Sequence, residues 1–199
     1  GRTVNLTQHE NEPLLTFDEL DVRRIDPKST VFSDADYVFH FAGIGEIVPS
    51  VERPIEYMSV NVQGTLRVLE ASREAMVRKV VYAASSSCYG VAKIPTPEDH
   101  AIDLRYPYAL SKYQGEQACF HWAQVYGLPV NSIRIFNAYG TRSRASGAYG
   151  AVFGTFLRQK LANEPFTVVG DGTQKRDFVY ATDVVSAFFF AGIESASGE

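Results

Sequence analysis

The feature that most constrains the fold of this chain is a regular alternation of short apolar runs with longer helical patterns. Several runs end in glycine or serine, and the segments between them carry apolar residues at helical spacing. We expect strands at 37–43, 79–84, 130–136 and 166–169, and helices at 55–75, 106–126, 151–162 and 183–193. Strands that alternate with helices form right-handed crossovers, so the pattern predicts an α/β fold with a doubly wound, mostly parallel sheet.

Turn and cap signals mark the ends of these elements. Gly127 predicts the end of the helix at 106–126, because glycine adopts the left-handed conformation that closes many helices. Thr182 predicts the N-cap of the last helix, and Gly170 and Gly172 indicate a turn. Residues 1–20 are mostly polar and lack a clear period, which predicts a loop.

Composition argues against several classes of protein. With 199 residues the chain is long enough for one good-sized core. Its net charge of −4 argues against a nucleic-acid surface, which needs clustered lysine and arginine. The apolar run at 187–193 is too short to span a bilayer. Cys88 and Cys119 make neither a disulfide framework nor a metal site, so we expect a cytoplasmic protein without a metal.

The candidate site lies where the predicted strands end. Ligands of doubly wound sheets bind at the carboxyl ends of the strands. There the chain places Phe41-Ala42-Gly43, the serine triplet 85–87 and Asn137. Gly43 allows a backbone to approach a cofactor closely, although tight packing is an equally simple explanation of a glycine. The serines could also mark a strand that breaks into a loop.

Tyr108 and Lys112 are the strongest catalytic candidates. Residues four apart lie on the same face of a helix. A free phenol has a pKa of about 10, and a nearby ammonium favours the phenolate, which can then accept the proton of a substrate hydroxyl. An ordinary amphipathic tyrosine with a solvated lysine would show the same short pattern. Ser85 favours the catalytic interpretation, because its hydroxyl can bond both the substrate oxygen and the tyrosine.

Five ordered blocks of the sequence resemble the extended short-chain dehydrogenase/reductase family, in its NAD-dependent epimerase/dehydratase branch. The blocks are 40–43, 85–90, 107–112, 134–140 and 170–178, and the resemblance runs over nearly the whole chain from Asp21 onward. It implies a Rossmann-type NAD-binding domain in residues 1–140. It also implies the start of a smaller nucleotide-sugar-binding region, interleaved with the last Rossmann elements, in residues 141–199.

The resemblance assigns roles to individual residues, with NAD as cofactor and a nucleotide sugar as substrate. The catalytic residues would be Ser85, Tyr108 and Lys112. The NAD contacts would be Asp21 and Val22 at the adenine ring, Phe41, Ala42, Gly43 and Asn61 along the cofactor, and Tyr108 and Lys112 at the nicotinamide end. The substrate contacts would be Ser86, Ser87, Asn137 and Arg176. A guanidinium suits phosphate oxygens, although a solvated surface role for Arg176 is the plainer alternative. The family also implies a homodimer.

The chain departs from the family pattern in two places. The glycine-rich turn that would seat a pyrophosphate on a helix N-terminus is absent. Gly1-Arg2 resembles the end of the loop after the second family strand, so we expect the first βαβ unit, roughly 30 residues or more, and the segment after Glu199 to lie outside this sequence. Gly45 stands where sugar 4-epimerases often carry a lysine, which leaves the exact sugar open.

Ser86 and Ser87 bear on the type of reaction. Sugar 4,6-dehydratases of this family place Asp-Glu at these positions, and decarboxylating relatives usually have a glutamate there. Without an acid, elimination has no obvious proton donor, whereas epimerisation needs none. The sequence therefore predicts a nucleotide-sugar 4-epimerase that transiently oxidises C4 of a UDP-sugar with tightly bound NAD. The alternatives are an NAD-dependent nucleotide-sugar reductase, a dehydratase, or a non-catalytic NAD-binding protein of the same fold.

Overall fold

Three parallel strands form the central sheet of this chain, whose computed structural model describes residues 3–142, 152–195, 197 and 198. The strands are β1 (Tyr37–His40), β2 (Lys79–Ser85) and β3 (Val130–Ile135), in the order β1-β2-β3. Val80 of β2 is in register with Val38 on one side and Val130 on the other. The predicted parallel α/β sheet is therefore confirmed.

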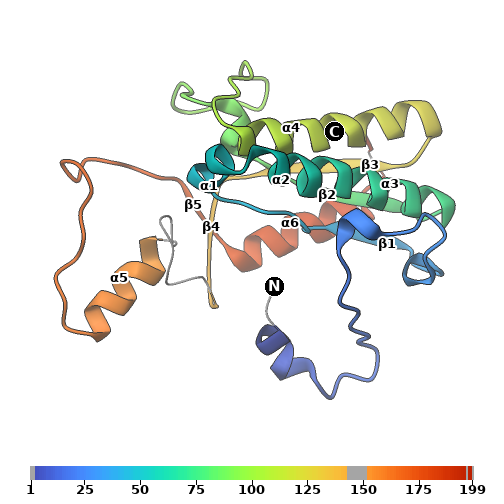
Figure 1. The fold of residues 1–199 in the computed structure, drawn as a ribbon, viewed down its shortest axis with the longest axis horizontal. Helices are drawn as coiled ribbons and strands as arrows, with labels where there is room; N and C mark the ends of the chain where they lie inside the picture. Colours follow the sequence, from blue (N-terminus) through green and yellow to red (C-terminus); the bar gives the residue numbers. More distant parts are fainter. Residues whose placement is uncertain (1–2, 143–151, 196, 199) are drawn as a thin grey trace.

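Helices cover both faces of this sheet (Figure 1). One face packs against α3 (Gly64–Glu74) and α4 (Pro107–Tyr126), and the other against α6 (Ala181–Ile193). Because strand side chains alternate in direction, neighbouring residues of β2 enter different cores. Tyr82 joins the core under α3 and α4, whereas Val81 packs against Phe188 of α6. Burial on both faces explains why residues 80–84 are apolar without alternation.

The helix α4, which carries both Tyr108 and Lys112, begins and ends where local signals predict. Pro107 occupies its first position, where the missing backbone N–H is not needed for a helical hydrogen bond. Gly127 closes it in the left-handed conformation, with φ +68°, and its N–H donates to the carbonyl of Ala123. The predicted helix at 106–126 and its glycine stop are confirmed.

The helix predicted at 55–75 is divided in the structure. It consists of α2 (Pro54–Met58), the single π-helical turn η4 (Ser59–Gln63) and α3, and it is preceded by the unpredicted α1 (Ile47–Glu52). The buried Asn61 lies in the π-helical turn. Such turns inside helices often occur at functional sites.

A second, two-stranded parallel sheet brings distant parts of the sequence together. β4 (Asn137–Tyr139) starts one residue after β3 and pairs with β5 (Phe178–Tyr180), so that Asn137 is in register with Phe178. The intervening α5 (Val152–Leu161) lies away from the central sheet in Figure 1. Neither β4 nor β5 was expected as a separate strand, and their pairing places the segment before Phe178 beside the end of β3.

The prediction of a strand at 166–169 is wrong. In the structure this segment belongs to no sheet, and Val168 and Val169 are 60% and 78% exposed. Thr167 is instead tied to α5, because Gln159 accepts its backbone N–H and donates to its hydroxyl. A strand requires a hydrogen-bonded neighbour, and apolar β-branched residues alone do not supply one.

Several element boundaries also differ from expectation. Tyr180, at the end of β5, is the N-cap of α6, and Thr182 lies inside the helix. The run at 37–43 is a strand only to His40.

Part of the N-terminal segment predicted as loop is the 3-10 helix η1 (Thr3–His9). Three further 3-10 turns are η2 (Val22–Arg24), η3 (Thr30–Phe32) and η5 (Ser86–Tyr89). The first residue of the helix predicted at 151–162, and Gly1-Arg2, lie outside the described residues. No helix in the described part of the chain combines the length and apolar character needed to cross a membrane.

Candidate active site

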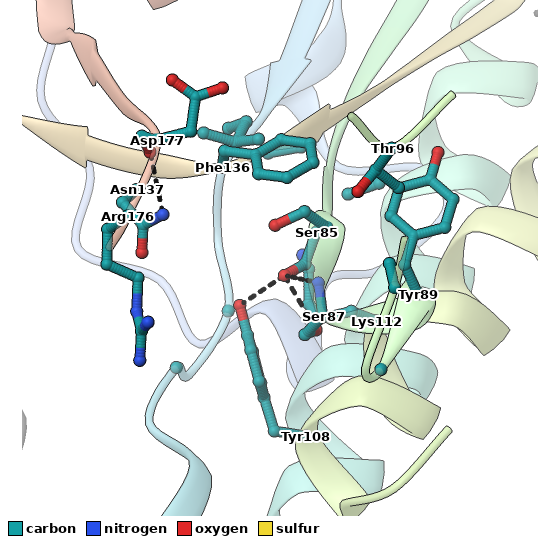
Figure 2. A pocket seen from close by; sticks show the side chains of 18 of the residues that line it. Ser85, Ser87, Tyr89, Thr96, Tyr108, Lys112, Phe136, Asn137, Arg176 and Asp177 are labelled. Atoms are coloured by element: carbon teal, nitrogen blue, oxygen red, sulfur yellow. Dashed lines mark hydrogen bonds between the residues drawn. The ribbon is translucent and has the colours of Figure 1, made fainter. Parts of the chain in front are cut away.

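A cavity of about 1140 Å³ opens at the carboxyl ends of β2 and β3. Figure 2 shows its two sides, with Tyr108 and Ser85 on one and Asn137 and Arg176 on the other. Nine of the residues selected from the sequence line this one space, namely Phe41, Gly43, Ser85, Ser86, Ser87, Tyr108, Lys112, Asn137 and Arg176. Six elements or loops supply them, so the crossovers of the fold, and not sequence proximity, assemble the site.

Tyr108 projects from the first turn of α4 toward the end of β2. Its hydroxyl oxygen lies a long 3.4 Å from Ser85 Oγ, within hydrogen-bond reach (Figure 2). The edge of its ring contacts Tyr57, with the centroids 6.3 Å apart. Burial raises the pKa of the Tyr108 phenol above its ordinary value, and the hydrogen bond with Ser85 acts in the opposite direction. A group that favours the phenolate is therefore needed before Tyr108 can act as a base.

Lys112 lies one turn along α4 and is 7% exposed. Its ammonium is 4.4 Å from the centre of the Tyr82 ring, a cation–π contact. Burial lowers the pKa of Lys112 to about 8. The sequence led us to expect that Lys112 would lower the pKa of Tyr108, but in this structure that pKa is raised. The two side chains do share a face and a cavity, and burial acts against the charged form of both.

Asn61 holds the loop that follows β1. Its Oδ1 accepts the Ile44 N–H at 2.8 Å, and its Nδ2 donates to the Ile44 carbonyl and to Ser111 Oγ, both at 2.9 Å. A Cβ added to Gly43 would lie 3.0 Å from Asn61 Oδ1 and 3.9 Å from Lys112 Nζ. Glycine thus leaves a cradle between this loop and α4 that any larger side chain would fill.

The three serines after β2 are linked to one another. Ser85 Oγ accepts the backbone N–H of Ser87 at 3.2 Å and the Ser87 hydroxyl at 2.9 Å. Ser85 is thereby the N-cap of η5, which turns the chain away from the sheet. Positions 86 and 87 carry hydroxyls and no carboxylate, so the wall beside Ser85 holds no strong acid.

Opposite Tyr108, the β4–β5 pairing brings Lys175 and Arg176 to the cavity, and these two residues form a cationic wall. Asn137 Nδ2 donates to the Asp177 carbonyl at 2.8 Å, and Arg176 Nη1 donates to the Lys175 carbonyl at 2.9 Å. The charged residues that line the described cavity are Lys112, Lys175, Arg176 and Asp177. Three cations against one carboxylate favour an anionic ligand.

Four residues selected from the sequence do not line this cavity. Ala42 and Asn61 flank it, and Asn61 acts by holding the loop. Asp21 is paired with Arg23, whose hydrogen bonds lower the pKa of the carboxyl to about 2. Val22 packs against α3, since a Cβ added to Gly64 would lie 2.6 Å from Val22 Cγ2. The role of Asp21 and Val22 at an adenine ring stays a prediction.

The sequence reasoning missed the wall formed by Tyr89 and the segment 92–96. Tyr89 belongs to one of the family-like blocks, but 92–96 has no period that singles it out. Arg134 holds this wall: its Nη1 donates to Tyr89 Oη at 2.8 Å, and Tyr89 Oη donates to the Glu98 carbonyl at 3.1 Å. The buried Glu116 of α4 accepts from Arg134 Nη2 at 2.9 Å. This ion pair therefore connects α4 and β3 with the wall formed by Tyr89 and residues 92–96.

Comparison with known proteins gives a consistent result over the whole chain. The sequence model of the NAD dependent epimerase/dehydratase family matches residues 2–199. UDP-glucose 4-epimerase of Mycolicibacterium smegmatis is 35% identical over 202 residues, which is 100% of this chain and 64% of the relative. UDP-N-acetyl-alpha-D-glucosaminuronate decarboxylase of Bacillus cytotoxicus is 36% identical over 170 residues, covering 82% of this chain and 52% of the relative.

A solved structure shares the fold closely. It is UDP-N-acetylglucosamine 4-epimerase from Methanobrevibacter ruminantium in complex with UDP-N-acetylmuramic acid, with a TM-score of 0.92 and 30% identity. The match covers 99% of this chain and 63% of that one. The chain thus spans between about half and two thirds of the length of these relatives.

Proposed function

The chain belongs to the NAD dependent epimerase/dehydratase family, and from this premise we propose that it acts in the 4-epimerisation of a nucleotide sugar with NAD as cofactor. Family membership confirms the resemblance, and the close structural neighbour confirms the Rossmann-type fold. The observation that carries the proposal is the meeting of Ser85, Tyr108 and Lys112 in one cavity that has no acid at positions 86 and 87.

The residues around Gly43 fit the nicotinamide end of NAD. The cradle that a Cβ at Gly43 would fill suits the close approach of a flat ring, and the amino group of Lys112 borders it. Lys112 would donate to a ribose hydroxyl, while Phe41 and Ala42 would line the cofactor. When bound, NAD supplies reversible oxidation of the sugar carbon, a chemistry that no side chain can perform.

In this proposal Tyr108 transfers the proton of the sugar hydroxyl, and Ser85 contacts the same oxygen. Tyr108 Oη takes the proton of the sugar 4-hydroxyl and later gives it back. Ser85, at 3.4 Å, lies near enough for both hydroxyls to contact the same substrate oxygen. Lys112 adds a positive charge near the phenol whenever it is protonated, which is the greater part of the time below a pH of about 8.

The proposed substrate is a UDP-sugar. The three relatives described above act on or bind UDP-linked sugars, and the cavity carries more cations than carboxylates. We propose that Arg176 and Asn137 contact the diphosphate side, with Lys175 adding charge there. Ser86 and Ser87 would then face the sugar. A homodimer and a cytoplasmic location complete the proposal, to be checked by light scattering and by cell fractionation.

The absence of an acid beside Ser85 favours epimerisation over elimination. Loss of the 6-hydroxyl requires a proton donor next to it, and a serine hydroxyl is far too weak an acid. The carboxylate of Asp177 lines the cavity, but in Figure 2 it points away from Ser85 and Tyr108. Oxidation and re-reduction at C4 would need only Ser85, Tyr108 and Lys112 together with bound NAD.

Product analysis tests the proposal. The protein is incubated in deuterated water with UDP-glucose, UDP-N-acetylglucosamine and UDP-glucuronic acid, with NAD added, and the products are separated. We expect the C4 epimer of at least one sugar, no net change in cofactor absorbance and no deuterium at C5. A 4-keto-6-deoxy sugar would identify a dehydratase, and release of CO₂ a decarboxylase. In a parallel incubation with NADH in place of NAD, stoichiometric consumption of NADH would identify a reductase. NAD binding without any product would support a non-catalytic protein.

A further inference from the structure

Three donors converge on the oxygen of Ser85. They are the Ser87 hydroxyl at 2.9 Å, the Ser87 backbone N–H at 3.2 Å and the Tyr108 hydroxyl at 3.4 Å. A serine hydroxyl has two lone pairs that accept and one hydrogen that it can donate. Three donors therefore compete for two acceptor positions, and the Tyr108 contact is the longest of the three.

The two donors of Ser87 are better placed than Tyr108 to occupy those lone pairs, because both lie closer to Ser85 Oγ. The backbone N–H is fixed by the η5 turn, in which Ser85 is the N-cap residue. The Ser87 hydroxyl lies at an ordinary hydrogen-bond distance for two oxygens, and both serines are partly shielded from water. When Ser87 fills both lone pairs, the hydrogen of Ser85 is left free to be donated into the cavity.

We propose that Ser87 is a positioning residue that sets the direction of the Ser85 hydroxyl, so that Ser85 donates toward Tyr108 Oη and the reacting oxygen instead of accepting from them. The proposal rests on the proposed function, in which Tyr108 works as a base. It assigns Ser87 a role different from the substrate contact expected from the sequence. Ser87 acts on the reaction through Ser85.

The direction of this bond matters because it decides which form of Tyr108 is favoured. A hydroxyl that donates to the phenolate stabilises it, whereas one that accepts from the phenol stabilises the neutral form. The other titratable groups around Tyr108 are Tyr57 of α2, Tyr82 of β2 and Lys112 of α4, with Lys175, Arg176 and Asp177 across the cavity. A change at Ser87 leaves all of them in place.

Substitution of Ser87 separates this role from a purely structural one. Ser87→Ala keeps the backbone N–H and hence the cap of η5, but it frees one lone pair of Ser85, to which Tyr108 can then donate. Ser87→Thr retains the hydroxyl. Ser87→Cys retains a side chain of similar size with a weak donor and should behave like alanine. Ser86→Ala removes a neighbouring hydroxyl that does not bond Ser85 and is the control for the titration.

The direct measurement is the titration of Tyr108 by NMR of protein labelled with ¹³C at Cζ of tyrosine, with the signal assigned by Tyr108→Phe. We expect Ser87→Ala and Ser87→Cys to raise the pKa of Tyr108 by about one pH unit, and Ser87→Thr and Ser86→Ala to leave it unchanged. In turnover, the alanine variant should lose roughly tenfold in kcat at neutral pH with little change in KM, and threonine should restore it.

An unchanged pKa of Tyr108 in Ser87→Ala, or a threonine variant that behaves like alanine, would overturn the proposal. If Ser87→Ala does not fold, the cysteine and threonine pair decides the matter in the same way. The titration needs no substrate. A protein that converts no nucleotide sugar would refute the proposed function, while the NMR result would still judge the role of Ser87.

Discussion

At the scale of single residues, burial disfavours the charged forms of Tyr108 and Lys112, the two groups that matter most to the proposal. Burial raises the pKa of Tyr108 and lowers the pKa of Lys112 to about 8. Each is thus pushed toward its neutral form in the protein without ligands. The shift of Lys112 brings its pKa toward the working pH, as is common in active sites, whereas the shift of Tyr108 moves its pKa away from that pH, so Tyr108 needs a group that favours the phenolate.

Removal of the Tyr108 hydroxyl tests its role as the base. Tyr108→Phe keeps the ring and its edge contact with Tyr57 but removes the proton acceptor. We expect turnover to fall by about 10²- to 10⁴-fold with the fold and NAD binding retained. Circular dichroism, NAD titration and kcat are the measurements. A variant with near-normal kcat on the substrate of the natural enzyme would show that another group moves the proton.

Lys112 predicts an unusual dependence of stability on pH. Its folded pKa of about 8 lies below the ordinary value of 10.5, so between these values the unfolded chain binds more protons and stability rises with pH. Below pH 8 the buried charge carries its full penalty, of the order of 3 kcal/mol. Lys112→Met should therefore stabilise the cofactor-free protein at pH 7, and this gain should shrink toward zero as the pH approaches 10.5.

Urea unfolding at pH 7, 9 and 10.5 measures this difference. The exposed Lys93→Met is the matched control and should change stability by less than about 0.5 kcal/mol at each pH. A destabilised Lys112→Met at pH 7 would mean that the cation–π contact with Tyr82 outweighs the penalty of burial. In either case we expect weaker NAD binding, because the proposed donor to the ribose is lost.

At the scale of elements, the close approach of α4 to β2 decides where Tyr108 and Lys112, the proposed catalytic pair, lie. Gly115 is the point of contact, because a Cβ there would lie 2.3 Å from Tyr82 Oη and 2.9 Å from Cζ of the same ring. Tyr82 is fully buried between α4 and the sheet and cannot move aside. A glycine in mid-helix, which by itself lowers helix stability, is explained by this approach.

Gly115→Ala should destabilise the protein by about 1–3 kcal/mol, through overpacking that exceeds the gain of up to about 1 kcal/mol in helix propensity. It should also reduce kcat, because α4 must move away from the sheet together with Tyr108. The exposed Gln117→Ala on the same helix is the control and should be neutral or slightly stabilising. A Gly115→Ala protein as stable and active as the parent would show that α4 is not held at this distance in solution.

The ion pair between α4 and β3 makes a second prediction for these elements. Glu116 is buried, and Arg134 contacts it through both Nε and Nη2. Glu116→Gln leaves the guanidinium without its counter-charge, so we expect a loss in the region of 3 kcal/mol. The exposed pair of Arg158 and Glu164 is the comparison: Glu164→Gln should change stability by no more than about 1 kcal/mol. Equal effects in the two variants would mean that the Glu116 pair is effectively solvated.

At the scale of the whole molecule, the buried core and the exposed segments are sharply divided. Every residue of β2 except Ser85 is buried, whereas residues 164–177 are exposed throughout. Residues 3–20 are exposed apart from the partly buried Leu6. The site lies at the border of the two regions, with Tyr108 on the packed side and Arg176 on an exposed segment.

Hydrogen exchange should reproduce this division. We expect the slowest amides in β1, β2 and β3, with opening energies near the global free energy of unfolding, and fast exchange in 3–20 and 164–177. Addition of UDP should slow exchange around Arg176 if the cationic wall binds the diphosphate. Strong protection of 3–20 in the free protein would show instead that this segment is covered in solution, for example by a second copy of the chain.

The sequence by itself determined the elements whose signals are local. Pro107 and Gly127 bound α4 through backbone preferences that act within a few residues. Apolar runs identified the strands of the central sheet, most clearly β2, which is buried on both faces. The order of the family-like blocks led to the serine triplet, Tyr108 and Lys112, and nine of the selected residues do line one cavity.

Only the tertiary structure decided the features that depend on a partner distant in the chain. Residues 166–169 have strand-like composition but no neighbour to pair with, whereas β4 and β5 became strands because each had one. The pKa of Lys112 follows from its burial, and the role proposed for Ser87 follows from the three donors that meet at Ser85. Hydrogen bonds and desolvation act over a few ångströms in space, and a sequence pattern records only which residues are near in the chain.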